Sequence, residues 1–214
     1  WNDFKQTEYI VAISCSPDTQ QIDAYAKYNA FVINCKDLSI ATEENWRDIA
    51  LVFSHEYFHN WNPYSALPAF RAHFDELAWF IEGFTDYYAT LLLYKTGIIS
   101  FDQCVDETYF HLEAYYASPF RNITNLEFVQ NRYKDPRIQL LPYQKGYALA
   151  LLWDDQIRST SKGKASLDDL MLSLFQAKLE NITPSEIGDF AKHYMGDIAI
   201  SDIERYILKG ETIP

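Results

Sequence analysis

A pair of histidines four positions apart, in the segment HEYFH, constrains this chain more than any other feature of its sequence. Around the pair, apolar residues recur at helical spacing, so we expect a helix over about 42–61, with Thr42 as its N-cap. Residues four apart lie on one face of a helix, so the imidazoles of His55 and His59 can bind the same Zn²⁺ ion. Glu56 lies beside them, in position to face a water molecule bound to that ion. The segment therefore predicts a helix that presents two metal ligands and a general base.

A third ligand is required, because a catalytic zinc site has three protein ligands and keeps its fourth position open. The apolar pattern predicts a second helix over about 75–96, which ends just before Gly97. Glu82 lies within it, in the aromatic segment WFIEGFTDYY, where an unpaired carboxylate would be costly to bury. Asp86 follows four positions later on the same face and can accept a hydrogen bond from a ligand histidine. We therefore expect Glu82 as the third metal ligand and Asp86 as the carboxylate that orients a histidine.

A candidate for a further component of such a site is Tyr143, in the segment LPYQKGYALALLWDDQIR. The apolar spacing of this segment predicts a helix over about 140–160. Hydrolysis of an amide by a metal-activated water builds negative charge on the former carbonyl oxygen, and a phenol hydroxyl aimed at that oxygen would stabilise it. We therefore expect Tyr143 to donate a hydrogen bond in the transition state. The remaining histidines have no partner at ligand spacing and are expected to be ordinary surface or packing residues: His73, His111 and His193.

Composition and charge exclude several other classes of protein. Of the 214 residues, 48% are hydrophobic and 16% aromatic, with only 7 Gly and 8 Pro, which is typical of a folded domain rather than a disordered chain. A formal net charge of −12 argues against binding to nucleic acid or to anionic membranes, and no apolar run is long enough to cross a bilayer. Cys15, Cys35 and Cys104 lie far apart without a pairing pattern, so we expect no disulfide to hold the fold together. We expect a soluble protein, and the sequence leaves open whether it belongs to the cytoplasm or the periplasm.

The order of patterns along the chain predicts a small amino-terminal sheet followed by a helical body. Short β-branched apolar runs at 9–14 and 30–35 are typical of strands. We therefore expect an α+β fold, mainly α, with a sheet subdomain over about 1–40 and a helical, metal-binding part over about 41–214. Further helices are expected over about 101–117, 166–179, 184–195 and 201–209, with capping boxes that begin at Ser166, Thr183 and Ser201.

Taken in order, these segments resemble the glycyl aminopeptidase family of zinc metallopeptidases, which is related to aminopeptidase N and to the leukotriene hydrolases. The resemblance covers nearly all of residues 9–214 and rests on the segments HEYFHNWN, WFIEGFTDYY with LLLYKTGIIS after it, PYQKGYALALLWDDQIR, SLDDLM and IERYILKGETIP. It implies a thermolysin-like zincin catalytic domain with one Zn²⁺ per chain and a peptide as substrate. The roles that it implies are metal ligands for His55, His59 and Glu82, general base for Glu56, supporting carboxylate for Asp86 and transition-state donor for Tyr143.

The resemblance also implies that residues 1–214 are one catalytic domain of a larger enzyme. Relatives carry an amino-terminal β domain and often a carboxy-terminal PDZ domain, and neither is recognised in this sequence. In relatives the neighbouring domains help to form the substrate cleft. We therefore expect flanking domains of the same chain as further partners of the metal-binding part.

One departure from the family pattern concerns the free amine of the substrate. Relatives carry a Glu in a Gly-rich strand that binds this amine, whereas Val32 occupies the corresponding position in the stretch YNAFVIN. The expected function is therefore a zinc-dependent peptidase, first of all an aminopeptidase, with an endopeptidase or an amidase acting on blocked amino termini as the alternative. A catalytically idle zinc-containing domain that binds peptides is a third hypothesis. The strand at 30–35 is expected to pair with an extended peptide along its edge.

Overall fold

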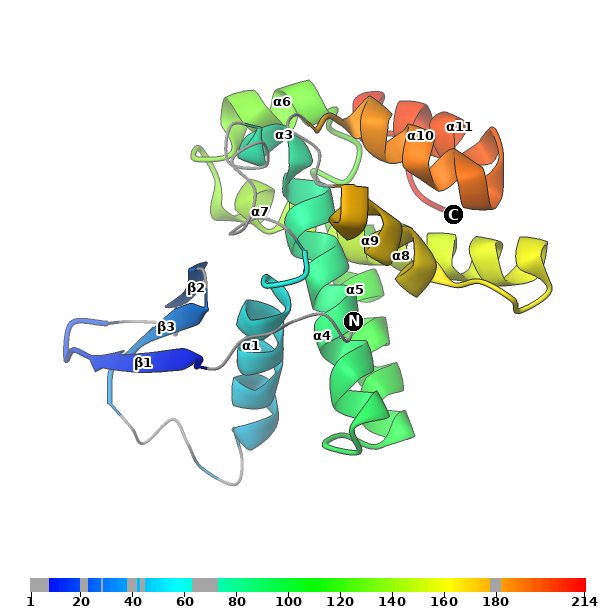
Figure 1. Ribbon diagram of the computed structural model, residues 1–214. Coiled ribbons are helices and arrows are strands. Elements are labelled where there is room, and N and C mark those ends of the chain that lie inside the picture. Colours follow the sequence, from blue (N-terminus) through cyan, green and yellow to red (C-terminus); the bar gives the residue numbers. More distant parts are fainter. Residues whose placement is uncertain are drawn as a thin grey trace.

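The computed structural model describes residues 8–19, 23–27, 29–37, 42, 45–62, 73–177 and 182–214. In these ranges a small sheet lies to one side of a helical body (Figure 1), and the expected mainly helical α+β fold is confirmed. The sheet has the order β1-β3-β2, in which β1 runs parallel to β3 and β2 runs antiparallel to it. Its strands are β1 (Ile10–Cys15), β2 (Asp23–Lys27) and β3 (Ala30–Cys35).

The strands expected at 9–14 and 30–35 are confirmed to within one residue, whereas β2 is not predicted by the sequence. The sequence of β2, DAYAK, contains no β-branched residue, and Ala, Asp and Lys are all uncommon in strands. Because β3 is the middle strand, the prediction that it pairs with a peptide along its edge is wrong. The open edges of the sheet, within the described ranges, belong to β1 and β2.

Helix α1 (Trp46–Phe58) begins later than the helix expected over 42–61. Its N-cap is Asn45 rather than Thr42. The Oγ1 atom of Thr42 accepts a hydrogen bond of 3.2 Å from the Asn45 amide, in the turn before the helix. In Figure 1, α1 lies between the sheet and helix α4 (Phe84–Lys95). Helix α1 therefore contacts both parts of the fold.

The second expected helix, over 75–96, is confirmed as one continuous helical segment made of three parts. Helix α3 (Phe74–Ala78) leads into a π-helical segment, η2 (Trp79–Gly83), and then into α4, after which Gly97 adopts a left-handed φ of 76°. The sequence does not predict the π-helical segment, because residues 77–85 are all buried and this stretch has no one-sided apolar pattern that an inserted residue could shift. Such turns are frequent at functional sites, and this one contains Glu82.

The remaining helices follow the expected order. Those expected over 101–117, 140–160 and 184–195 are confirmed to within one residue. The helix expected over 166–179 is confirmed up to Ala177, after which residues 178–181 lie outside the described part of the chain. Two short helices, α6 and α7, are missed because their apolar pattern covers only one or two turns. The helices are α5 (Phe101–Ala117), α6 (Asn125–Asn131), α7 (Pro136–Gln139), α8 (Leu141–Ser161), α9 (Leu167–Ala177), α10 (Pro184–Met195), α11 (Ile198–Asp202) and the π-helical η3 (Ile203–Leu208).

The predicted caps have mixed outcomes. Thr183 is the N-cap of α10, where its side chain accepts a hydrogen bond from the Glu186 amide. Ser166 precedes α9, and its own amide donates to the carboxylate of Asp169. The capping box expected at Ser201 is wrong, because α11 begins at Ile198 and Ser201 lies inside it.

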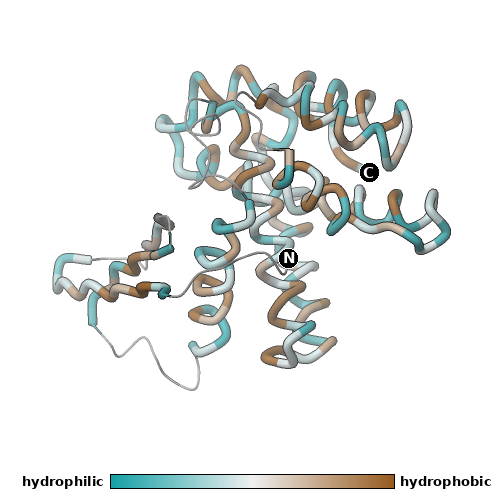
Figure 2. Tube along the Cα trace, viewed as in Figure 1, coloured by the Kyte–Doolittle hydropathy of each residue, from teal (hydrophilic) through white to brown (hydrophobic). Residues whose placement is uncertain are grey.

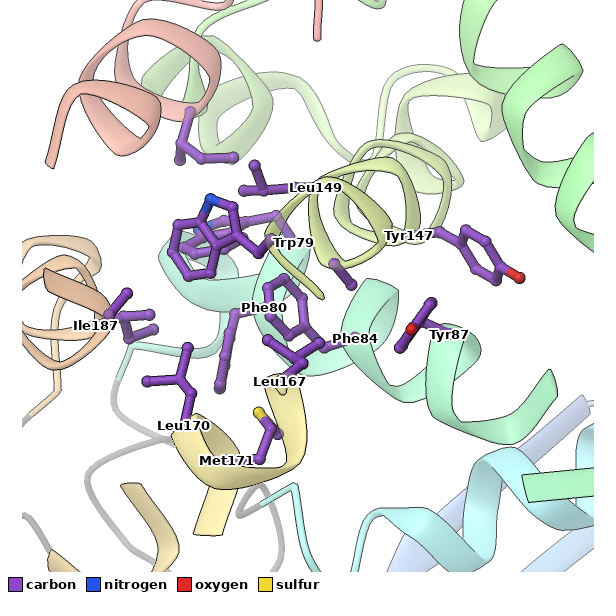
Figure 3. Packing of buried hydrophobic residues seen from close by; sticks show 14 of the residues in the cluster. Trp79, Phe80, Phe84, Tyr87, Tyr147, Leu149, Leu167, Leu170, Met171 and Ile187 are labelled. Carbon is purple, nitrogen blue, oxygen red and sulfur yellow. The ribbon is translucent and has the colours of Figure 1, made fainter. Parts of the chain in front are cut away.

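The core of the helical body forms where η2 and α4 pack against α8. Trp79, Phe84 and Trp153 meet there edge to face and are at most 2% exposed. Burying side chains of this size contributes about 1.5–3 kcal/mol each. Figure 3 shows Phe80 and Phe84 among aliphatic side chains from α8 and α9.

Along the tube in Figure 2, hydrophobic and hydrophilic stretches alternate within the helices, as expected for helices that bury one side. Within the described ranges, no helix combines the length and the apolar character that a bilayer crossing needs.

Segment η2 and helix α8 touch through their backbones at Gly83 and Gly146. A Cβ atom on Gly146 would lie 1.8 Å from the carbonyl oxygen of Trp79, and one on Gly83 would lie 2.3 Å from the Cα atom of Gly146. Only glycine allows two backbones to approach this closely. The contact brings the first turn of α8, which carries Tyr143, against the turn that carries Glu82.

Candidate metal centre

Two histidine side chains face each other at the carboxyl end of α1. His55 lies in the last turn of the helix, and His59 follows the helix as its C-cap. Their Nε2 atoms are 3.0 Å apart, and both residues are buried. Nδ1 of His55 lies 2.6 Å from Oδ1 of Asp86 on α4. Because the aspartate accepts a hydrogen bond from Nδ1, the Nε2 atom of His55 is left to bind a metal ion.

Glu82 completes a compact triangle of donor atoms. Its Oε2 lies 3.3 Å from Nε2 of His55 and 3.6 Å from Nε2 of His59. Ligand atoms at about 2.0–2.1 Å from a tetrahedral zinc ion are separated from one another by roughly 3.3–3.4 Å. The three observed separations, 3.0, 3.3 and 3.6 Å, bracket this value, so the residues fit such an ion. The structure thus brings the three expected ligands together in a candidate metal site.

The charges around this triangle favour an ionised carboxylate. Burial raises the pKa of Glu82, but hydrogen bonds from His55 and His59 outweigh burial and hold this pKa well below its usual range. Burial lowers the pKa of His55, but Asp86 and Glu82 outweigh burial and raise this pKa well above its usual value. The protein therefore stabilises positive charge at a buried point beside an ionised carboxylate, which suits a dication.

Asn62 holds the π-helical turn that carries Glu82. Asn62 is fully buried, and its Nδ2 donates hydrogen bonds to the carbonyl oxygens of Phe80 and Ile81, at 3.0 and 2.9 Å. The same nitrogen lies 2.9 Å from Oγ1 of Thr85. Because buried carbonyl groups need donors, this amide compensates for the irregular turn. Sequence reasoning missed Asn62, although it ends the segment HEYFHNWN, because an amide has no ligand role at that spacing.

Tyr143 lies on the other side of His55. The two rings stack with centroids 6.0 Å apart and an interplanar angle of 27°. Burial raises the pKa of the Tyr143 hydroxyl well above its usual value, and the charges of Glu82, Asp86 and Glu56 raise it further. The hydroxyl therefore stays protonated and can donate a hydrogen bond. The structure places Tyr143 next to the candidate metal site, as the proposed role requires.

A cavity of about 960 Å³ opens beside these groups. His55, Glu56, Glu82, Asp86 and Tyr143 all line it, and Glu56 is itself buried. The volume falls in the range typical of sites for small ligands. The arrangement can hold an amide group between a carboxylate that accepts a proton and a hydroxyl that donates a hydrogen bond.

The sheet contributes little to this cavity. Among the described residues of the sheet, Ala24 on β2 lines it. Phe31 and Ile33 are buried, and Val32 between them points to the opposite face of β3, since successive residues of a strand alternate. Val32 is therefore not part of the cavity wall.

Several wall residues come from elements that the sequence did not connect with the site. Glu107 on α5 has its Oε1 atom 3.2 Å from Nε of Arg47 on α1, and both residues line the cavity. His111 packs face to face on Tyr147, with ring centroids 4.2 Å apart, as expected for a packing residue. It also lines the cavity, which was not expected. No local signal could reveal these residues, because α5 meets α1 only in the folded chain.

Comparison with known proteins identifies a similar family and a similar fold. The sequence model of the M61 glycyl aminopeptidase family matches residues 48–148, a range that includes every expected site residue. The crystal structure of an aminopeptidase N family protein from Idiomarina loihiensis has a similar fold, with a TM-score of 0.72 and 18% sequence identity. The match covers 96% of this chain and 39% of that one. No curated protein sequence matches the chain significantly. The family match supports a peptidase, the structural match supports the fold, and the resemblance expected from the motifs is confirmed.

Proposed function

We propose that the chain is a zinc-dependent aminopeptidase of the glycyl aminopeptidase type, with one Zn²⁺ held by His55, His59 and Glu82. The observation that carries the proposal is the buried triangle of donor atoms, 3.0 to 3.6 Å apart, beside a cavity that can hold the end of a peptide. Two imidazoles and one carboxylate are a known ligand set of catalytic zinc. This set leaves a fourth position open, as hydrolysis requires.

The remaining side chains have roles that follow from their positions. A bound Zn²⁺ would supply a Lewis acid and lower the pKa of a water molecule to about 7. Glu56, in the cavity wall, would accept a proton from the attacking water and return it to the departing amine. Tyr143 would donate a hydrogen bond to the carbonyl oxygen as negative charge develops there. Asp86 holds His55 in the tautomer that leaves Nε2 free.

The charge of the cavity supports a substrate with a free amino group. Asp48, Asp106 and Glu107 line the cavity. Two arginines also line it, and both are paired with carboxylates: Arg47 with Glu107 and Arg132 with Asp75. This surplus of carboxylates attracts a positively charged α-amino group. The alternative, an endopeptidase or an amidase for blocked amino termini, rested on Val32, which is not part of the wall. The aminopeptidase is therefore the better supported proposal.

A pair of reporters distinguishes these two activities. The test compares hydrolysis of an aminoacyl reporter that has a free amine with hydrolysis of the same reporter after acetylation. A hydrogen bond to a charged group contributes about 1.5–3 kcal/mol, so we expect kcat/KM to be about 10- to 100-fold lower for the acetylated form. Equal values would reject the aminopeptidase while leaving the peptidase intact.

Metal content and turnover test the ligands and the base separately. Zinc-loaded protein is expected to contain one Zn²⁺ per chain by elemental analysis, and Glu82→Ala is expected to lose it. Glu56→Gln is expected to keep the metal and to lose turnover by about 10²- to 10⁴-fold. Glu113→Gln, at an exposed position on α5, is the matched control and should keep both.

The outcomes of that experiment separate the hypotheses. Full zinc occupancy in Glu82→Ala would reject Glu82 as a ligand, and wild-type turnover in Glu56→Gln would reject the general base. A metal-loaded wild type that binds peptides without hydrolysing them would favour the catalytically idle domain.

We also propose that flanking domains complete the substrate cleft, as the resemblance implies. Support comes from the 39% share of the similar structure that this chain spans. The expected result is that the chain alone binds zinc fully but hydrolyses peptides more slowly than a longer protein that includes the amino-terminal β domain. Equal turnover would contradict this role for the flanking domains.

A further inference from the structure

Cys15 and Cys35 lie side by side in the sheet, although 20 positions separate them in the sequence. They are register partners in the parallel pair formed by β1 and β3, and their Sγ atoms are 3.6 Å apart. The two residues are thus distant in the sequence and adjacent in the folded chain, where both thiols are free. Cys104 lies on a different element, α5.

The geometry of the pair permits a covalent bond. Neighbouring strands lie about 4.7–4.9 Å apart, and disulfides join Cα atoms about 4.4–6.8 Å apart. Residues in register on adjacent strands meet this requirement, so the two Sγ atoms can come together by side-chain rotation while the hydrogen-bond ladder stays in place. We propose that Cys15 and Cys35 are a site of oxidative modification, at which an intramolecular disulfide forms by exchange with a low-molecular-weight disulfide.

The two thiols differ in access, which sets the order of the exchange. Cys15 is exposed and Cys35 is fully buried. The thiolate of Cys15 attacks one sulfur of the external disulfide, forms a mixed disulfide and releases one thiol. Cys35 then loses its proton, attacks Sγ of Cys15 and releases the second thiol. Two protein thiols are thereby oxidised, and one external disulfide is reduced to two thiols.

The buried position of Cys35 affects the second step. Burial raises the pKa of Cys35, and the adjacent Cys15 raises it further. Because the thiolate is the nucleophile, closure of the disulfide is expected to be faster at alkaline pH.

The proposed disulfide would attach the exposed edge strand β1 covalently to β3. All six residues of β1 are exposed, including the apolar side chains of Ile10, Val11 and Ile13. β3, in contrast, packs Phe31 edge to face on Phe53 of α1, with ring centroids 5.1 Å apart. The disulfide would therefore link an exposed edge strand to a strand that is packed on the helical body. Neither cysteine lines the cavity, so the inference does not depend on the proposed peptidase activity.

Oxidised glutathione tests the proposal on the whole chain. After incubation, denaturation and alkylation of the remaining thiols, mass spectrometry is expected to find one alkylated thiol, at Cys104, and a peptide in which Cys15 is joined to Cys35. The thermal midpoint is expected to rise by about 5–10 °C, because a crosslink across 20 positions restricts the unfolded chain. Reduction with dithiothreitol should reverse both changes.

Single-cysteine variants provide the controls. Cys104→Ser should keep the disulfide and the rise in thermal midpoint. Cys15→Ser, at an exposed position, should show no rise and should leave two alkylated thiols. Three alkylated thiols in the wild type, or a glutathione adduct that persists on Cys15 without a crosslink, would overturn the proposal. These readouts are independent of metal content and turnover, so their failure would leave the zinc peptidase proposal untouched.

Discussion

Replacing Gly146 by alanine tests the backbone contact that sets the distance between η2 and α8. The new Cβ atom would lie 1.8 Å from the carbonyl oxygen of Trp79 and 2.8 Å from Cα of Gly83. Real Cβ atoms essentially never have contacts shorter than 3.0 Å, so the two backbones must move apart by more than about 1 Å. Alanine is favoured over glycine inside a helix by about 0.8–1.0 kcal/mol, which opposes this cost. Since the clash involves backbone atoms, the cost of overpacking, about 1–3 kcal/mol or more, is expected to exceed the gain.

Separation of the two backbones also weakens the aromatic core. Trp79 and Trp153 meet across this interface with ring centroids 6.4 Å apart, and a wider gap removes dispersion contacts. We therefore expect a net loss of about 2–3 kcal/mol in the free energy of unfolding and a thermal midpoint lower by roughly 5–10 °C. Turnover should also fall in the folded fraction, because Tyr143 moves away from Glu82 together with α8.

Thermal and urea denaturation measure this effect, with Gly188→Ala as the matched control. Gly188 also lies inside a helix, but a Cβ atom there would meet Cδ1 of Ile200 at 3.1 Å, the end of a flexible side chain. This variant has the same gain in helix propensity without a backbone clash, so its stability should stay within about 1 kcal/mol of the wild type. If Gly146→Ala proved as stable as Gly188→Ala, the two backbones would not be in contact and the reasoning would fail.

Three further predictions concern single side chains. Tyr143→Phe should lower kcat by about 10²- to 10³-fold with little change in KM, because the hydroxyl acts on developing charge; an unchanged kcat in steady-state kinetics would remove Tyr143 from the mechanism. Asp86→Asn should weaken zinc binding by about 10- to 100-fold in a titration against a chelator, and an unchanged affinity would contradict its supporting role. Burial lowers the pKa of Lys145 from 10.5 to about 8, so the folded protein releases this proton at a lower pH than the unfolded chain, and stability should rise with pH between these values. Urea titrations should show this contribution as about 2 kcal/mol between pH 7.5 and 9.5, and Lys145→Met should lack it; the same pH dependence in both proteins would contradict the assignment.

The helices that carry the candidate ligands could be predicted because their signals are local. Each contains a periodic apolar pattern of several turns, and helix geometry alone puts His55 and His59 on one face. Glu82 could be found because a carboxylate among aromatic residues needs a partner. The start of α1 was predicted less well, since Thr42 is a suitable cap but its side chain bonds in the preceding turn. Cap preferences indicate which residue types can start a helix, and several nearby residues of those types compete.

Features that depend on contacts between distant segments could not be predicted. The π-helical turn is held by Asn62, which reaches it from the end of another helix. Glu107 and His111 reach the cavity wall only because α5 packs beside α4 and α8. Strand β2 has a sequence with weak strand propensity, and it forms a strand because β3 offers it an antiparallel partner. Asn62, Glu107 and His111 have partners far along the chain, so no short window of sequence contains both. The strands β2 and β3 are neighbours in the sequence, and there the pairing in the sheet overrides the weak strand propensity of β2.

Three contacts between helical segments assemble the candidate site. A histidine–aspartate hydrogen bond joins α1 to α4, the amide of Asn62 joins the segment after α1 to η2, and the glycine pair joins η2 to α8. Groups on packed helices are held more precisely than groups on loops. Substitutions at Asn62, Gly83 or Gly146 should therefore disturb the chemistry more than substitutions in the sheet, where Ala24 is the described residue that lines the cavity. For the same reason, a disulfide between β1 and β3 should change the stability of the sheet and leave the geometry of the metal site unchanged.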